Sequence, residues 1–113
     1  MKYYSEKESG ELRLRFEEEV LSWSQVSTKK MFGCPCYKAN GKLFAFLVTK
    51  GIVLTQLDEA EREKLSQKHG GTFFRAGRKI VRSWIRVPIK NEKHLSKVMG
   101  FVRRSYEGGV GEV

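Results

Sequence analysis

The first twenty-odd residues carry the pattern of an amphipathic helix. Apolar residues recur three or four positions apart, the spacing that lines one face of a helix, at Leu12, Phe16, Val20 and Trp23. Ser9 is a candidate N-cap for this helix. Glutamates at positions 17–19 give its other face a negative patch. We therefore predict a first helix with one packed and one acidic face.

Short apolar runs separated by turn residues follow the helix, which is the pattern of strands. The Asn40-Gly41 dipeptide favours a type I′ hairpin turn. The run after it is apolar at every position from 43 to 48, which indicates a central strand covered on both faces. We predict an antiparallel meander with strands at 29–32, 36–39, 43–48 and 52–55.

The second half of the chain predicts two helices with two strands between them. Asp58 and Glu61 have the spacing of a capping box, which opens a helix that runs to about His69 and ends at Gly70-Gly71. Further strands are predicted at 72–75 and 80–87, a last helix at 91–106 and a flexible tail at 108–113. Together, residues 1–107 predict one α+β domain, a two-layer sandwich whose antiparallel sheet carries the N- and C-terminal helices.

Length and composition fit a single domain. A chain of 113 residues with 40% hydrophobic residues closes one modest core. It contains no apolar run long enough to cross a membrane, and its N-terminus lacks the apolar stretch of a secretory signal. We therefore expect a soluble cytoplasmic protein without membrane contacts.

The net charge of +9 is concentrated in one third of the chain. Ten of the 22 Lys and Arg residues lie between Arg75 and Arg104, where the only acidic residue is Glu92, and the remainder is neutral. A localised positive field attracts nucleic acid, an acidic protein surface or anionic lipid.

The predicted strand at 80–87 carries the centre of this charge. Because alternate side chains of a strand share a face, Arg82, Trp84 and Arg86 should lie together. Arginines beside an exposed indole would hold phosphates and stack a base. The alternative is that the indole lies in the packed face and the arginines are solvated or paired with the glutamates at 17–19. If the last helix faces the same side, the candidate surface for a protein partner or nucleic acid comprises Arg75, Arg78, Lys79, Arg82, Trp84, Arg86, Lys93, Lys97 and Arg104.

The residue types that bind metals are few. A structural zinc site needs four ligands in closed geometry, and only Cys34, Cys36, His69 and His94 are of the Cys and His types. Their spacings match no familiar zinc finger, so we expect no metal and no cofactor. A disulfide between the two cysteines would close a strained ring across Pro35.

A reactive thiol and a packing role are both open for the two cysteines. Three nearby lysines, at positions 29, 30 and 38, would lower a thiol pKa, whereas cysteines in strands commonly serve as small packing residues. No Ser/His/Asp order, carboxylate pair, phosphate-binding glycine loop or dinucleotide fingerprint is present. We therefore expect no catalytic residues and no enzyme activity.

Several sequence segments in a fixed order resemble the TfoX N-terminal domain family. These are KKMFG at 29–33, NGKLFAFLV at 40–48, IVLTQLDEAEREKL at 52–65 and, after a glycine turn, IRVP at 85–88. The resemblance covers nearly the whole chain. It implies a two-layer, secretion-chaperone-like α+β fold with helices on one side of an antiparallel sheet, and a link to the regulation of bacterial competence. The positions that carry over are structural: Met31, Phe32 and Gly33 at the first strand, Gly41 at the hairpin, and Arg86, Val87 and Pro88 at the end of the late strand.

Two functions follow as expectations. The resemblance implies a non-catalytic regulatory module that docks a protein partner, stands alone without the family's C-terminal domain, and could form a homodimer. The charge pattern implies direct binding of nucleic acid through the basic surface of residues 75–104. Because the resemblance covers the whole chain and the charge only a third of it, the protein-interaction role is the preferred expectation.

Overall fold

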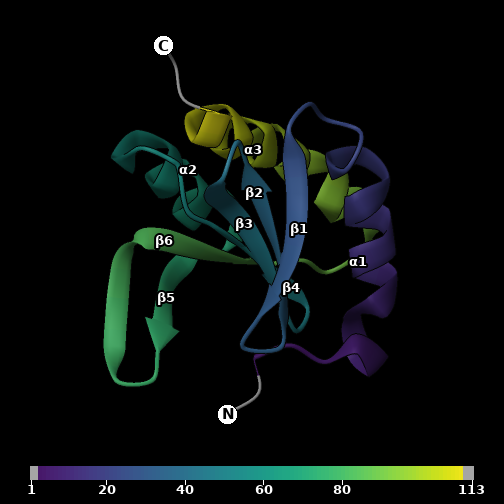
Figure 1. Cartoon of the computed structure of the whole chain (residues 1–113). Coiled ribbons are helices and arrows are strands. Elements are labelled where there is room, and N and C mark those ends of the chain that lie inside the picture. Colours follow the sequence, from purple (N-terminus) through teal and green to yellow (C-terminus); the bar gives the residue numbers. More distant parts are fainter. Residues whose placement is uncertain (1–2, 111–113) are drawn as a thin grey trace.

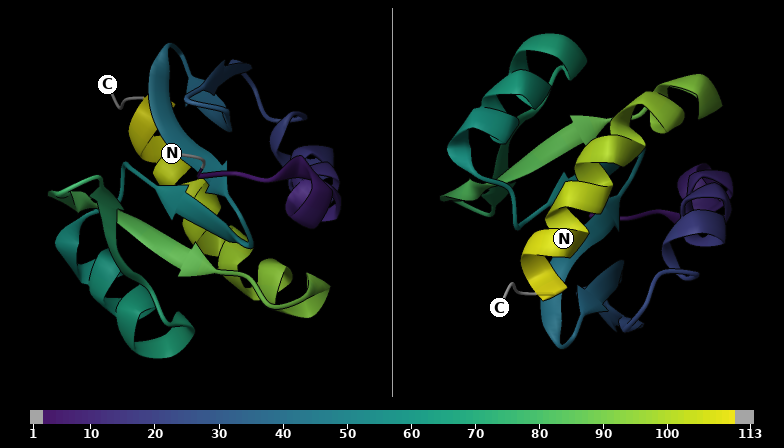
Figure 2. Two further views of the ribbon diagram at one scale, coloured as in Figure 1. Left: turned by 90° about the horizontal axis from the view of Figure 1, so that it is seen from below. Right: turned by 90° about the horizontal axis from the view of Figure 1, so that it is seen from above.

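A six-stranded antiparallel sheet with three helices makes up the computed structural model, which describes residues 3–110 (Figure 1). The strand order is β1-β2-β3-β4-β6-β5, and the helices lie on one side of the curved sheet (Figure 2). This confirms the predicted α+β class, with the N- and C-terminal helices packed on an antiparallel sheet. In chain order the elements are α1 (Glu6–Val20), β1 (Val26–Met31), β2 (Cys34–Ala39), β3 (Lys42–Val48), β4 (Gly51–Leu54), α2 (Glu59–His69), β5 (Thr72–Ala76), β6 (Lys79–Pro88) and α3 (Glu92–Val110).

Helix α1 begins earlier than the sequence pattern predicts. Its N-cap is Ser5, whose hydroxyl accepts a hydrogen bond from the backbone N–H of Glu8 at 3.3 Å. Ser9, the predicted cap, lies inside the helix at a kink with φ −129°. Its buried hydroxyl instead accepts a hydrogen bond from the backbone N–H of Lys50 at 2.6 Å. The prediction of Ser9 as the cap is therefore wrong, because a distant turn uses that hydroxyl.

Two hairpin turns have positive φ at both central residues, as a type I′ turn requires. Asn40 (φ 53°) and Gly41 (φ 84°) form the predicted turn between β2 and β3. Phe32 (φ 53°) and Gly33 (φ 79°) form another between β1 and β2, so β1 ends one residue earlier than predicted. The Phe32 side chain is 84% exposed. A phenylalanine in this conformation is strained and covers no core.

The central position of β3 and the start of α2 are as predicted. Residues 44–48 of β3 are all buried. At α2 the Asp58 carboxylate accepts a hydrogen bond from the Glu61 backbone N–H at 2.8 Å, and the Glu61 carboxylate accepts one from the Asp58 backbone N–H at 3.4 Å. The helix stops at Gly70, which has the left-handed φ of 72°.

Helix α3 continues to Val110, so the predicted tail is wrong for residues 108–110. Gly108 lies so close to the segment after β4 that a Cβ there would come within 2.7 Å of the Gln56 carbonyl oxygen, and Gly109 is buried against Ala39 and Phe44. Gly109 therefore allows the helix to approach β2 and β3, and Gly108 allows it to approach the segment after β4. One turn earlier, the buried Ser105 hydroxyl donates to the Phe44 carbonyl at 2.6 Å. The remaining predicted tail, 111–113, lies outside the described residues.

Candidate functional site

The β5–β6 hairpin extends beyond the rest of the sheet as a two-stranded arm. Strand β6 pairs with β4 only along residues 85–88, whereas its outer residues 79–81 pair only with β5. Gly77 makes the turn at the tip with φ 62°. The arm occupies the lower left of Figure 1, where no helix covers its end. Side chains on the outer half are therefore accessible to a partner.

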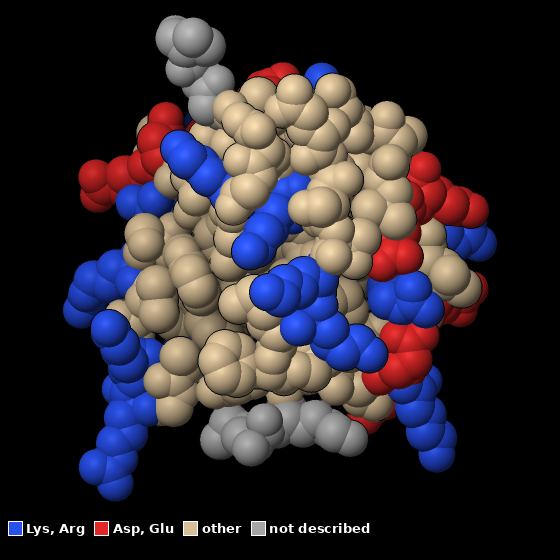
Figure 3. All heavy atoms as spheres, viewed as in Figure 1, with Lys and Arg blue, Asp and Glu red and all other residues tan. Residues whose placement is uncertain are grey.

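Four of the residues predicted to bind a partner lie on this arm: Arg75, Arg78, Lys79 and Arg82, all exposed. The sequence holds no Asp or Glu between positions 64 and 91. Within residues 3–110, none of the four side chains forms an ion pair, including the predicted alternative pairing with the glutamates at 17–19. Figure 3 shows the corresponding basic side chains at the lower left, over the arm. Within this part of the chain their positive charge is therefore not neutralised by an ion pair, although Glu59 and Glu63 of α2 line the same groove as Arg82.

An exposed aromatic ring accompanies these charges. Phe73 is 49% exposed, and the Arg82 guanidinium lies 5.5 Å from the centre of its ring. A groove of about 610 Å³ runs from these two side chains toward α2. Phe73 was not among the predicted site residues, although the FF pair before a run of basic residues is visible in the sequence.

The predicted grouping of Arg82, Trp84 and Arg86 is wrong. The pairing of β5 with β6 shifts between Phe73 and Phe74, and this irregularity breaks the alternation of side chains. Arg82 consequently lines the groove beside α2, whereas Arg86 lines a different one beside Tyr3 and Thr49.

Trp84 is not a free stacking platform. Its ring is half-buried and packs on Phe46 and Phe74, with ring centres 5.5 and 5.9 Å apart. This is the alternative in which the indole belongs to the packed part of the sheet. Trp84 therefore packs within the sheet, whereas the arginines of the arm remain exposed.

The basic residues of α3 form a second group away from the arm. Lys93, Lys97 and Arg104 are exposed on a helix that packs on β3 and β2. Arg104 lies 3.4 Å from the Glu61 carboxylate of α2. Helix α2 lies beside β6 and contacts α3 at Arg104 and His94 (Figure 2), and its first turn carries acidic residues. The expectation of one continuous basic surface is therefore wrong.

The two cysteines are buried packing residues on β2. Both side chains are buried, and burial raises the pKa of the Cys34 thiol to about 11 and also raises that of Cys36. A thiol with such a pKa stays protonated at neutral pH and is a poor nucleophile. The effect of the nearby lysines is smaller than that of burial, so the reactive-thiol hypothesis is not supported.

The two histidines contact each other across α2 and α3. His69 Nδ1 lies 3.2 Å from His94 Nε2. The Lys90 backbone N–H donates a hydrogen bond to His94 Nδ1 at 3.3 Å, so neutral His94 carries its proton on Nε2. This Nε2–H donates a hydrogen bond to His69 Nδ1. Within residues 3–110, no group of three His, Cys, Asp or Glu side chains could hold a metal ion.

We expect acid to weaken this contact. Burial, followed by the charges of His69, Lys90 and Lys97, lowers the pKa of His94. Because folded His94 binds a proton less readily than unfolded His94, its contribution to stability is present above pH 6.5 and decreases as pH falls below that value. Urea unfolding between pH 7.5 and 5 measures this, and the decrease should be smaller in His94→Gln. An equal decrease in both proteins would contradict the assignment.

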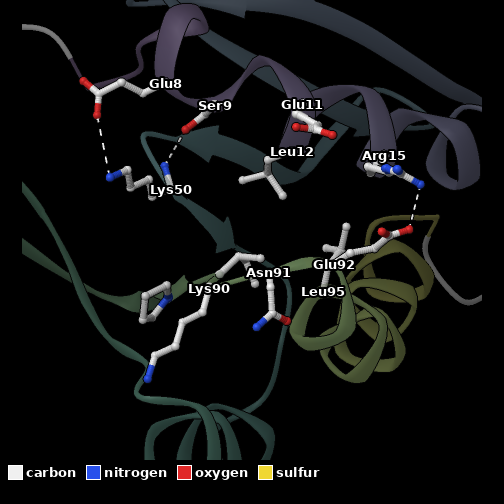
Figure 4. A pocket seen from close by; sticks show the side chains of 12 residues that line it. Glu8, Ser9, Glu11, Leu12, Arg15, Lys50, Lys90, Asn91, Glu92 and Leu95 are labelled. Carbon is white, nitrogen blue, oxygen red and sulfur yellow. Dashed lines mark hydrogen bonds and ion pairs between the residues drawn. The ribbon is translucent and has the colours of Figure 1, made fainter.

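A hollow of about 660 Å³ lies between α1 and the start of α3 (Figure 4). Ion pairs border it: Arg15 lies 2.7 Å from Glu92, and Lys50 lies 4.0 Å from Glu8. Asn91 faces the hollow but is occupied as the cap that accepts the His94 backbone N–H at 2.8 Å. The polar groups named here at the border of the hollow are thus held by ion pairs and hydrogen bonds, and they form no acid–base or nucleophile pair.

Comparisons with protein-family profiles, with curated proteins and with solved structures found no match. Within the described residues, no helix is both long and apolar enough to cross a membrane.

Proposed function

We propose that this chain is a non-catalytic nucleic-acid-binding module that uses the β5–β6 arm. The observation that carries the proposal is the presence of four exposed, unpaired cationic side chains on a two-stranded extension with no acidic residue in its sequence. Phosphate contacts by Lys and Arg supply most of the affinity of such proteins. A two-stranded ribbon also has a width that the major groove of DNA accepts.

This proposal differs from the preferred expectation, a protein-docking regulator. The arm concentrates positive charge on a projecting element, whereas the family resemblance specifies no surface. A cytoplasmic location and a regulatory role of the TfoX N-terminal type are retained as parts of the proposal, supported by the segments at 29–33, 40–48, 52–65 and 85–88.

The dependence of binding on salt tests the proposal. If the four cations of the arm each neutralise one phosphate, the logarithm of the affinity for duplex DNA should fall with the logarithm of salt concentration with a slope of about −3.6. Raising salt from about 50 to 200 mM would then weaken binding roughly 150-fold. Fluorescence anisotropy with an end-labelled duplex and a single strand of equal length measures both slopes. A folded protein that binds neither probe at 50 mM salt would refute the proposal and favour a protein partner.

A further inference from the structure

Strand β1 is an edge of the sheet with one side unpaired. Met31 and Cys34 flank a two-residue turn, so they form a hydrogen-bonded pair, and in an antiparallel ladder such pairs alternate along the strand. The backbone N–H and C=O groups of Val26, Thr28 and Lys30 therefore point away from β2. Within residues 3–110, no other strand pairs with β1 on that side. The edge offers the hydrogen bonds that an added strand would use.

A groove of about 500 Å³ lies between this strand and α1. Thr28, Lys29 and Lys30 line one wall, and Glu6, Arg13 and Glu17 line the other. In Figure 1, α1 runs beside β1 along the right-hand side of the molecule. A single extended segment beside β1 would thus have a helix as its second wall.

The carboxylates of the α1 wall are already paired. Arg13 contacts Glu6 at 2.8 Å and Glu17 at 3.1 Å, and the hydroxyls of Tyr4 and Tyr37 donate to the same two carboxylates at 2.7 and 2.6 Å. Hydrogen bonds from Arg13 and Tyr4 lower the pKa of Glu6 to about 2, so this carboxylate stays ionised and bound to them. The two carboxylates are therefore held by hydrogen bonds within the wall, and with Arg13 they leave it one net negative charge.

The β1 wall, in contrast, carries free positive charge. Lys29 and Lys30 are exposed, and neither forms an ion pair within the described part of the chain. Their side chains point to opposite faces of the strand. In Figure 3, basic side chains lie at the centre of the view, over β1. An added strand would meet a cation on each of its faces.

We propose that the groove between α1 and β1 binds an extended acidic peptide segment of another protein, which adds to the sheet as a seventh strand beside β1. The backbone hydrogen bonds to Val26, Thr28 and Lys30 supply affinity, and Lys29 and Lys30 select acidic side chains. At the end of the strand, the exposed ring of Phe32 offers an apolar contact to a longer peptide.

Two other occupants fit the groove less well. A second copy pairing through its own β1 would place lysines near lysines and would bring its own α1 into the same space. Nucleic acid would not use the backbone hydrogen-bonding groups of an edge strand, whereas an extended peptide would. The surface is separate from the β5–β6 arm, so the inference does not depend on the nucleic-acid proposal.

Binding of a synthetic probe tests the inference. The probe is a labelled nine-residue peptide of alternating Glu and Val, compared with one of alternating Gln and Val. We expect the acidic peptide alone to bind in anisotropy measurements, with NMR shifts and slower amide exchange at Val26, Thr28 and Lys30. Absence of binding would overturn the inference, as would shifts confined to the β5–β6 arm. A dimer that forms through β1 in sedimentation, and that the peptide does not dissociate, would overturn it in favour of a second copy.

Charge and backbone variants identify the binding mode. Lys29→Glu with Lys30→Glu should weaken peptide binding roughly tenfold, whereas Lys93→Glu with Lys97→Glu, an equal charge change on α3, should change it less than about twofold. Two N-methylated peptides provide the second comparison, one methylated on one set of alternate amides and one on the other set. Only methylation of the amides that face β1 should abolish binding. Equal effects of the two charge variants or of the two methylated peptides would overturn strand addition.

Discussion

Replacing Phe16 with alanine should destabilise the protein by about 4 kcal/mol. Phe16 is fully buried, and its ring centre lies 4.9 Å from that of Tyr37 on β2. Substitution would leave a cavity where α1 meets the sheet, and few other side chains of α1 are buried. Because domains of this size are stable by only about 5–15 kcal/mol, the loss would be a large part of the total. Urea unfolding followed by circular dichroism measures it.

Leu14→Ala is the matched control on the same helix. Leu14 is 58% exposed, so removing the same kind of apolar group there should change the free energy of unfolding by less than about 0.5 kcal/mol. If the two variants were equally stable, Phe16 would not be the contact that fixes α1 on the sheet.

The elements themselves follow from local patterns in the sequence. Apolar spacing identifies α1 and α3, the Asp58 and Glu61 pair identifies the start of α2, and the Asn40-Gly41 dipeptide identifies a type I′ turn. Each of these signals acts between residues fewer than about five positions apart, so no knowledge of the fold is needed to recognise them.

Errors arose where distant residues decide the local structure. Ser9 looks like a helix cap until the turn at Lys50 takes its hydroxyl as a hydrogen-bond acceptor. Gly108 and Gly109 look like a flexible tail until β2, β3 and the segment after β4 provide the surface on which they pack. In both cases, the partner is far away in the sequence and the residue type alone is ambiguous.

For the same reason, the candidate site could be predicted only in part. The basic residues near position 78 could be recognised from composition, but their division between two surfaces could not. Strict alternation along β6 would group Arg82 with Arg86, and the irregular pairing beside Phe73 separates them. Such an irregularity depends on how β5 and β6 pair, which single-strand periodicity does not encode.

The division of the basic residues between the arm and α3 also changes which of them are expected to contact phosphates. Arg104 forms an ion pair with a carboxylate of α2, whereas the cations on the arm form no ion pair in the described structure. An unpaired cation can exchange its counterions for a phosphate, but a paired one must first lose its partner. We therefore place the proposed nucleic-acid contacts on the arm and not on the whole basic third of the chain.

Reversing all four charges of the arm should abolish most of the binding to duplex DNA. The variant combines Arg75→Glu, Arg78→Glu, Lys79→Glu and Arg82→Glu. If the four side chains contact four phosphates, affinity at about 100 mM salt should fall roughly a thousandfold, and the salt slope should approach zero. All four side chains are exposed, so the fold should persist, which thermal unfolding checks. Anisotropy with the same end-labelled duplex measures the loss.

A control with the same total charge separates the arm from the field of the whole protein. Reversing four exposed lysines elsewhere, at Lys7, Lys42, Lys64 and Lys68, changes the net charge equally. Long-range attraction is screened within about 10 Å at 0.1 M salt, so this control should lose less than about tenfold in affinity. Equal losses in the two variants would mean that net charge governs binding and that the arm makes no phosphate contacts of its own.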